Sequence, residues 1–197
     1  MSGKENFIKK IAPIVQNINK SRGYPLFSSV VIAQACLETG FGASQLMMKA
    51  NAIFGIKAGI TWRGKVYSAK TKEVYNSKPV TITDTFRAYS SLEESIDDYF
   101  NLICNNKRYS RAVHSNNFVE CIHGIASGGY ATDPSYADKV IEIINSSLNL
   151  TKYDTTESIK EQAEIQAFSY SIGLTYELQV NLNVRYHPRI RVWNKKI

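Results

Sequence analysis

The sequence predicts a mostly helical α+β domain with a small antiparallel β-lobe inserted between its helices. Two patterns carry this prediction. Apolar residues recur at helical spacing before residue 40 and after residue 90, whereas polar residues alternate with apolar or β-branched ones at about residues 56–88. A chain of 197 residues, 44% of them hydrophobic, can bury a sizeable core. We expect one domain over residues 1–150 and a separate segment over residues 151–197.

The first and last parts of the domain are expected to be helical. Residues 5–19 place their apolar side chains on one helical face, and a Gly-Tyr-Pro break then separates them from a second apolar run. Further helices fit residues 117–127 and 134–148. Asp133, followed by proline, is typical of a helix N-cap and is expected to have a structural role.

The β-lobe and the helix after it have their own signals. Strand-like alternation covers residues 61–67, 72–75 and 80–86, with a turn before the last piece, which predicts a small antiparallel meander or lobe. Ser91 and Glu94 form a capping box that begins the next helix. Four acidic residues of that helix lie opposite its apolar face and are expected to be solvated: Glu93, Glu94, Asp97 and Asp98.

A glutamate at the end of the second helix is the first candidate for chemistry. Residues 27–37 are rich in apolar side chains and contain no Gly or Pro, and Gly40 then allows the left-handed conformation that ends helices. Glu38 therefore lies in the last turn. The carbonyl end of the helix and the apolar neighbours Leu37 and Phe41 both disfavour its ionised form. A protonated carboxylic acid is what a glycosidase needs to protonate a leaving oxygen, although a surface glutamate at a frayed helix end fits the same pattern.

Four sequence blocks follow one another in order. They are Ala-Gln-Ala-Cys-Leu-Glu-Thr-Gly at residues 33–40, Asn-Ala-Ile-Phe-Gly-Ile-Lys at 51–57, Thr-Asp-Thr-Phe-Arg-Ala-Tyr at 83–89 and Gly-Tyr-Ala-Thr-Asp-Pro-Ser-Tyr-Ala-Asp-Lys-Val at 129–140. Together they resemble glycoside hydrolase family 73, the peptidoglycan N-acetylglucosaminidases of bacterial autolysins, flagellar proteins and phage lysins. The first block alone would also suit goose-type lysozymes and lytic transglycosylases.

The resemblance implies both a fold and an activity. The fold is a lysozyme-like helical domain with the β-lobe across a cleft. The activity is hydrolysis of the β-1,4 bond between N-acetylglucosamine and N-acetylmuramic acid in peptidoglycan, with Glu38 as general acid and no cofactor or metal. Two alternatives stay open: a lytic transglycosylase or muramidase that shares the helix-end glutamate, and a wall-binding module without catalytic activity.

The β-lobe is expected to supply a second carboxylate. Glycosidases commonly pair the acid with a carboxylate that acts as base or nucleophile. Glu73 is our candidate, because it lies in the strand-like piece where the family places its second catalytic acid. Asp84 is an alternative, and it is otherwise expected to bind substrate or to be an exposed polar group at a strand end. The substrate's own N-acetyl group is a third candidate for the nucleophile.

The resemblance also assigns residues to substrate binding. Tyr130, on a Gly-Gly loop, is expected to contact substrate or stabilise the transition state with its hydroxyl, the alternative being an aromatic plug that anchors the loop. Tyr136 is expected in the core or the cleft wall, in contact with substrate. Asn51 is expected to bind an N-acetyl group, and the ring of Phe54 to pack against a sugar.

The net charge, the basic-residue pattern and the cysteine spacing limit which partners the sequence predicts. The net charge of +7 suits a polyanion such as nucleic acid, an anionic membrane or a cell wall. There is no zinc-ligand spacing, RNP-like strand or basic helix, so we expect no nucleic-acid partner. Three cysteines without Cys-x-x-Cys spacing predict neither a disulfide framework nor a metal site.

The N-terminus has no signal-peptide core, and no apolar run reaches membrane-spanning length, so membrane insertion is not expected. The expected place of action is the cell wall. The protein would reach it through an export route, through a signal sequence outside this chain, or by release of a phage-encoded protein from the host cytoplasm.

The segment after residue 150 differs from the preceding domain in residue composition. Residues 151–158 are polar and linker-like, and residues 178–185 resemble the opening strand of a bacterial SH3-like wall-binding domain. Such a strand could fold back on the domain or pair with another copy of the chain, which would give a homo-oligomer.

Overall fold

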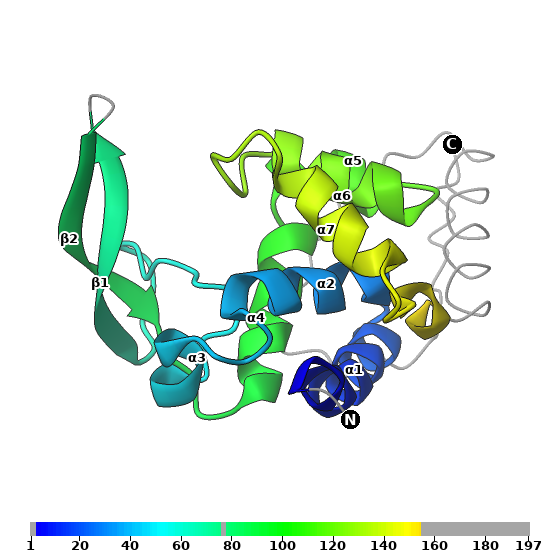
Figure 1. The fold of residues 1–197 in the computed structure, drawn as a ribbon, viewed down its shortest axis with the longest axis horizontal. Helices are drawn as coiled ribbons and strands as arrows, with labels where there is room; N and C mark the ends of the chain where they lie inside the picture. The colour runs from blue at the N-terminus through cyan, green and yellow to red at the C-terminus, as the bar shows by residue number, and fades with distance from the viewer. Residues whose placement is uncertain (1–2, 76–77, 155–197) are drawn as a thin grey trace, which may run out of the picture.

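The computed structural model describes residues 3–75 and 78–154, and the backbone alone over residues 71–75 and 78–82. The helices form one body, and two strands form a hairpin that extends from it (Figure 1). The mostly helical α+β class predicted from the sequence is confirmed. The described elements, in chain order, are α1 (Gly3–Arg22), α2 (Ser28–Thr39), α3 (Gln45–Ala50), β1 (Val66–Tyr75), β2 (Lys78–Arg87), α4 (Leu92–Cys104), η1 (Lys107–Tyr109), α5 (Ser110–Val113), α6 (Phe118–Ser127), α7 (Tyr136–Asn145) and η2 (Leu150–Tyr153).

Helix α2 lies at the centre of the helical body. Every side chain from Ser28 to Cys36 is buried, and the helix contacts α1, α6 and α7. A helix with buried side chains on every side must be surrounded by other elements, and these three helices pack around it (Figure 1). The last turn of α2 is therefore held by packing along the whole length of the helix.

The predicted small antiparallel β-lobe is confirmed, and in the described residues it is a two-stranded hairpin. Strand β1 pairs antiparallel with β2, with Val66 opposite Arg87 and Tyr75 opposite Lys78. The strand predicted at residues 61–67 begins only at Val66. Residues 61–65 contain a turn and a bend, and within them the Trp62 indole donates to the Lys65 carbonyl at 2.8 Å.

Two helical predictions also need correction. Helix α7 begins at Tyr136, two residues after the predicted start, and Asp133 is not its N-cap. The Asp133 carboxylate instead accepts the N–H and hydroxyl of Ser135, at 2.9 and 2.8 Å, and pairs with Lys139 at 2.6 Å. This local turn competes with the helix for the same backbone groups. Helix α3 was not predicted, because six residues are too few to show a period.

The capping box before α4 is confirmed, but the acidic face of that helix is not simply solvated. Ser91 Oγ accepts the Glu94 N–H at 3.2 Å, and the Glu94 carboxylate accepts the N–H of Ser90 at 2.7 Å. Asp97 pairs with Arg22 of α1 at 3.1 Å. The expectation holds for Glu93 and Glu94, which are exposed. It fails for Asp97 and Asp98, because their carboxylates face cationic side chains of neighbouring elements.

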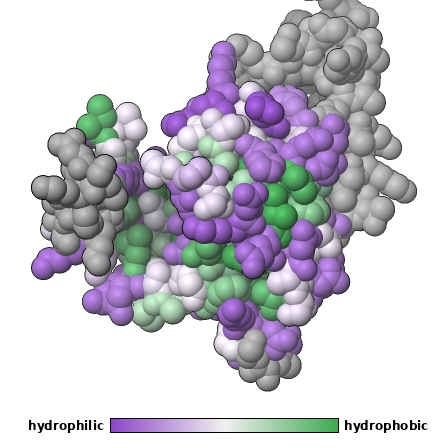
Figure 2. Space-filling view, turned by 45° about the horizontal axis from the view of Figure 1, so that its top comes forward, coloured by the Kyte–Doolittle hydropathy of each residue, from purple (hydrophilic) through white to green (hydrophobic). Residues whose placement is uncertain are grey.

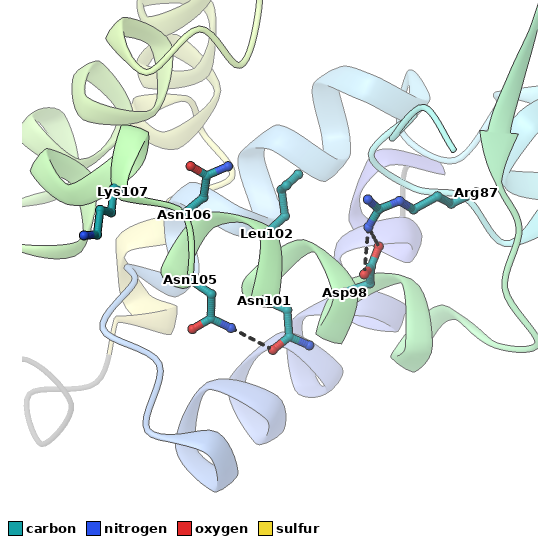
Figure 3. A pocket seen from close by; sticks show the side chains of 7 residues that line it. All are labelled: Arg87, Asp98, Asn101, Leu102, Asn105, Asn106 and Lys107. Carbon is teal, nitrogen blue, oxygen red and sulfur yellow. Dashed lines mark hydrogen bonds and ion pairs between the residues drawn. The ribbon is translucent and has the colours of Figure 1, made fainter. Parts of the chain in front are cut away.

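Asp98 ties α4 to the base of the hairpin (Figure 3). Arg87, the last residue of β2, donates from Nη1 to both carboxylate oxygens of Asp98, at 3.0 and 2.8 Å. The Tyr89 hydroxyl donates to the same carboxylate at 2.7 Å, and the Arg87 guanidinium lies 4.6 Å from the centre of the Trp62 ring. The side chains of Arg87 and Asp98 are only 18% and 19% exposed, so water screens their attraction less than it screens a surface pair.

The predicted linker and strand-like segment fall largely beyond residue 154, outside the described residues. None of the described helices combines the length and the hydrophobicity that a membrane span needs.

Asp98→Asn is expected to lower the free energy of unfolding by about 1–3 kcal/mol, because it leaves the half-buried Arg87 charge without its partner. Asp97→Asn is the matched control on the same helix. Burial raises the pKa of Asp97, so its ionised form is disfavoured in the folded state and its neutralisation costs little. Urea denaturation measures both variants. Equal losses of stability would contradict the proposed contribution of the Arg87–Asp98 pair.

Candidate active site

Glu38 lies in the last turn of α2, where the sequence places it. Gly40 ends the helix with a left-handed φ of 57°, and the N–H of Phe41 returns to the Cys36 carbonyl at 2.8 Å. The chain then turns tightly at Gly42, where a Cβ atom would lie 2.7 Å from the ring of Phe7. The backbone on either side of the carboxylate is therefore fixed by the helix and by the turn that follows it.

The Glu38 carboxyl group has a tyrosine partner. The hydroxyl of Tyr136, near the start of α7, donates to Glu38 Oε1 at 2.7 Å. Burial raises the pKa of Glu38, and the hydrogen bond from Tyr136 acts in the opposite direction with a smaller effect. The net direction is the one that the sequence predicts, so Glu38 keeps its proton to a higher pH than an exposed glutamate does.

A buried chain of polar groups continues behind this pair. Gln34 Nε2 donates to the Tyr136 hydroxyl at 3.0 Å, and Gln34 Oε1 accepts from the hydroxyl of Tyr99 on α4. Gln34 and Tyr99 are both fully buried, and Tyr136 is 5% exposed. Side chains from α2, α4 and α7 thus meet in one hydrogen-bonded series that ends at Glu38.

Tyr130 lies beside this series on the loop between α6 and α7. Its ring centre is 5.9 Å from that of Tyr99 and 5.7 Å from that of Tyr136, and its hydroxyl donates to the Phe54 carbonyl at 3.2 Å. Arg108 holds the loop by donating to the carbonyl of Gly128 and, at 3.3 Å, to that of the next residue. The structure therefore brings Tyr130 close to Tyr136 and gives its hydroxyl a partner within the protein, as in the loop-anchoring alternative.

Phe54 and Asn51 lie differently from what the sequence suggests. The ring of Phe54 is 4% exposed and stacks on Tyr99 with ring centres 4.0 Å apart. It therefore packs in the core behind Glu38 and does not line an open surface. Asn51 ends α3 with a left-handed φ of 51°, and its Nδ2 donates to the Tyr89 carbonyl at 3.1 Å. Both residues help to place the segment between α3 and the lobe.

The acidic residues Glu73 and Asp84 belong to the hairpin, a different part of the chain from the helices that carry Glu38 and its tyrosine partners. Asp84 pairs with Lys57 at 2.7 Å and accepts the Thr85 N–H at 2.7 Å, and the hydrogen bond from Lys57 is the main cause of its lowered pKa. Glu73, described by its backbone, stands opposite Val80 in the register. Asp84 stands opposite Ala69, four residues from Glu73, so the two acidic residues occupy the same face of the ribbon.

The thiols and the metal-binding residue types form no second site among the described residues. All three cysteines are free, and burial raises the pKa of the Cys36 thiol to about 12. A thiol of this kind is protonated at neutral pH and is a poor nucleophile. Within residues 3–75 and 78–154, no group of three or more His, Cys, Asp or Glu side chains is arranged to hold a metal ion.

Two hollows on the described surface are not lined by Glu38. One, of about 420 Å³, lies along α4 at the hairpin base and is lined by Arg87, Asp98, Asn101, Leu102, Asn105, Asn106 and Lys107 (Figure 3). The other, of about 560 Å³, lies beside α5 and α6. The helical body is mainly hydrophilic on the face in Figure 2, with apolar patches between the polar residues.

Comparison with known proteins identifies the family. Residues 12–150 match the glucosaminidase family model, described as mannosyl-glycoprotein endo-beta-N-acetylglucosaminidase. The chain belongs to this family. The chain is 37% identical over 180 residues to the peptidoglycan hydrolase FlgJ of Vibrio cholerae, covering 88% of the chain and 52% of that protein. It is 36% identical over 149 residues to the exo-glucosaminidase LytG of Bacillus subtilis, covering 73% of the chain and 52% of that protein. The chain thus spans about half the length of these relatives.

A solved structure agrees with this assignment. The catalytic domain of the autolysin Auto from Listeria monocytogenes superposes with a TM-score of 0.68 at 32% identity, covering 78% of the chain and 89% of that structure. The predicted lysozyme-like fold and the resemblance to glycoside hydrolase family 73 are confirmed.

Two polar residues of the candidate site were not predicted. Gln34 stands four residues before Glu38 and so on the same face of α2, which is a signal that the sequence does carry. Tyr99 belongs to the apolar stripe of α4 and looks like an ordinary core residue. Its hydroxyl becomes relevant only once the packing of α4 against α2 is known.

The raised pKa of Glu38 predicts a pH-dependent stability difference between the wild-type glucosaminidase domain and Glu38→Gln. A carboxyl group whose folded-state pKa exceeds its unfolded-state pKa favours folding fully at low pH, and this contribution is lost as pH rises through the folded-state pKa. The variant, which cannot ionise, should therefore unfold at a higher temperature than wild type at pH 7. The gap should close below the ordinary glutamate pKa of 4.5. Thermal unfolding followed by circular dichroism tests this, and a gap independent of pH would contradict it.

Proposed function

We propose that this domain is an endo-β-N-acetylglucosaminidase that hydrolyses the β-1,4 bond between N-acetylglucosamine and N-acetylmuramic acid in peptidoglycan. The observation that carries the proposal is the half-buried Glu38 carboxyl group, held by the Tyr136 hydroxyl at 2.7 Å. A carboxylic acid with a raised pKa is the group that donates a proton to a glycosidic oxygen. The names of FlgJ as a peptidoglycan hydrolase and of LytG as a glucosaminidase support the same bond and polymer.

The two opposed influences on Glu38 suit the two stages of this reaction. Before bond cleavage, burial raises the pKa of the carboxyl group and so favours its protonated form. As the proton moves to the leaving oxygen and the bond between that oxygen and the sugar carbon breaks, Glu38 becomes a carboxylate. A hydroxyl that already donates to Oε1 then stabilises the charge that develops, without any rearrangement.

We propose Glu73 as the group that assists the attack of water. Asp84 is the weaker candidate, because its carboxylate is already paired with Lys57 and bonded to the backbone. It is better suited to fixing the base of the hairpin than to contacting substrate. The remaining possibility is that the N-acetyl group of the substrate acts as nucleophile, in which case neither carboxylate of the hairpin is required.

Several further assignments belong to this proposal. From its place beside Tyr136, Tyr130 would contact the substrate or stabilise the transition state at the N-acetyl side of the sugar. Asn51 would bind an N-acetyl group. The substrate is a polyanionic wall, which the net charge of +7 favours. The place of action is therefore the cell wall, and the reaction needs no cofactor.

Glu38→Gln is expected to reduce the solubilisation of purified peptidoglycan by roughly 10²–10⁴-fold, the usual contribution of a general acid. The amide keeps the size and the hydrogen-bond acceptor but cannot supply a proton. Turbidity loss of a wall suspension measures the rate, and sedimentation with insoluble wall measures binding. Retained binding with lost lysis is the expected pattern. Full lysis by the variant would exclude Glu38 as the acid.

Glu73→Gln and Asp84→Asn separate the candidates for the second group. If Glu73 activates water, its variant should lose activity by a similar factor, whereas Asp84→Asn should act mainly on stability by releasing Lys57. A Glu73→Gln variant with near wild-type activity would contradict the proposed base. Substrate assistance would then be supported if Asp84→Asn is active too.

The bond and the mode of attack are tested by the products. A glucosaminidase should leave N-acetylglucosamine at the new reducing ends, a muramidase N-acetylmuramic acid, and a lytic transglycosylase anhydromuramic ends. Mass analysis of borohydride-reduced fragments distinguishes the three. Long soluble fragments early in digestion are expected for endo cleavage. Disaccharides alone would indicate exo cleavage, the activity for which the relative LytG is named. Binding without any release of sugar would leave only a wall-binding module.

A further inference from the structure

Gln34 is a buried polar residue with two specific partners next to the proposed acid. It has 0% exposure, and it lies one turn before Glu38 on the same helix. Its Nε2 donates to the Tyr136 hydroxyl at 3.0 Å, and its Oε1 accepts from Tyr99. A buried amide with both ends bonded to hydroxyl groups is oriented by those bonds as well as by packing.

The orientation of this amide decides which way the Tyr136 hydroxyl points. A hydroxyl has one proton to donate. When Gln34 donates to the Tyr136 oxygen, that proton is directed to Glu38 Oε1, as the structure has it. If the amide were reversed, Tyr136 would donate to the Gln34 oxygen instead, and Glu38 would lose its hydrogen bond.

Tyr99 fixes the orientation of the amide. Its hydroxyl is fully buried, and its ring stacks on Phe54. In the described part of the chain, Gln34 is the only hydrogen-bond partner of this hydroxyl, so the Tyr99 proton is satisfied only when it faces the amide oxygen. The reversed amide would leave that proton buried and unpaired.

We propose that Gln34 is a positioning residue for the general acid, acting through Tyr136, with Tyr99 setting the direction of the hydrogen-bond series. This inference rests on the proposed role of Glu38. The series runs from Tyr99 through Gln34 and Tyr136 to the carboxyl group, with every donor pointing toward Glu38. Successive hydrogen bonds of one direction polarise one another, so the bond to Glu38 is stronger than an isolated tyrosine would provide.

The series should influence the pH at which Glu38 loses its proton. The titratable groups of neighbouring elements that interact with Glu38 are tyrosines: Tyr99 on α4, Tyr130 on the loop and Tyr136 on α7. Burial raises the pKa of Tyr136, and the bond from Gln34 acts against that rise, which makes the hydroxyl a better donor. Removing Gln34 should therefore weaken the stabilisation of the Glu38 carboxylate and raise the pH at which it forms.

The decisive experiment is a double-mutant cycle of Gln34→Met and Tyr136→Phe, measured as the pH profile of hydrolysis of a soluble peptidoglycan fragment. Gln34→Met keeps the length of the side chain and removes both hydrogen-bonding ends. We expect kcat to fall roughly 10-fold with little change in KM, because a misplaced acid impairs chemistry more than binding. The basic limb of the profile should move to higher pH. In the Tyr136→Phe background, Gln34→Met should have no further effect on kcat or on that limb.

Asn19→Leu is the matched control for the loss of a buried amide. Asn19 on α1 donates to the Leu26 carbonyl at 2.6 Å and to Ser28 Oγ at 3.2 Å, and the structure gives it no part in the series to Glu38. It should lower the unfolding temperature without moving the pH profile. If Gln34→Met does not fold, Tyr99→Phe provides the same test, since it removes the donor that orients the amide and should move the basic limb in the same direction.

The outcomes separate this inference from the proposed function. A Gln34→Met or Tyr99→Phe protein with wild-type kcat and an unmoved basic limb would overturn the positioning role while Glu38→Gln remains inactive. Effects of Gln34→Met and Tyr136→Phe that simply add would also overturn it. Full activity of Glu38→Gln would instead overturn the proposed acid itself.

Discussion

The burial of α2 is the constraint on which the rest of the structure depends. Packing by α1, α6 and α7 fixes this helix along its length, so the residue that closes it cannot change place without repacking the core. Glu38 stands at that end, and the tight turn after Gly40 prevents the helix from extending over it. A flexible, solvated carboxylate would have an ordinary pKa. A carboxylate fixed at the end of a buried helix takes its properties from the neighbouring helices.

The site follows from how those helices meet. Helix α7 brings a tyrosine hydroxyl to the carboxyl group, α4 brings a second hydroxyl to the amide behind it, and the loop before α7 adds Tyr130 against both rings. The Arg87–Asp98 pair joins the hairpin to α4, the helix that carries Tyr99. The lobe with the proposed base and the body with the proposed acid are therefore connected through one helix. A carboxyl pKa that burial raises makes the fold less stable at neutral pH than at low pH, a stability cost that active sites commonly carry.

The sequence predicts the local features of this domain better than the contacts between its elements. The helix-end glutamate, the capping box of Ser91 and Glu94, and the family follow from residues that are close together or from ordered blocks. The ion pair of Asp98 and the burial of the Phe54 ring cannot be predicted in this way. Each depends on a partner from another element, Arg87 and Tyr99 respectively. The link from Tyr136 to Glu38 likewise spans 98 residues of chain, and no local period reports it.

The most direct test of the central claim is the titration of Glu38 itself. Carbon-13 labelling of glutamate side chains, with Glu38→Gln used to assign the carboxyl signal, gives its pKa by NMR in the folded domain. We predict a midpoint above the ordinary glutamate value of 4.5, lying higher again in Tyr136→Phe because the hydroxyl that favours the carboxylate is gone. A wild-type midpoint at or below that value would contradict the claim that burial raises the pKa of Glu38.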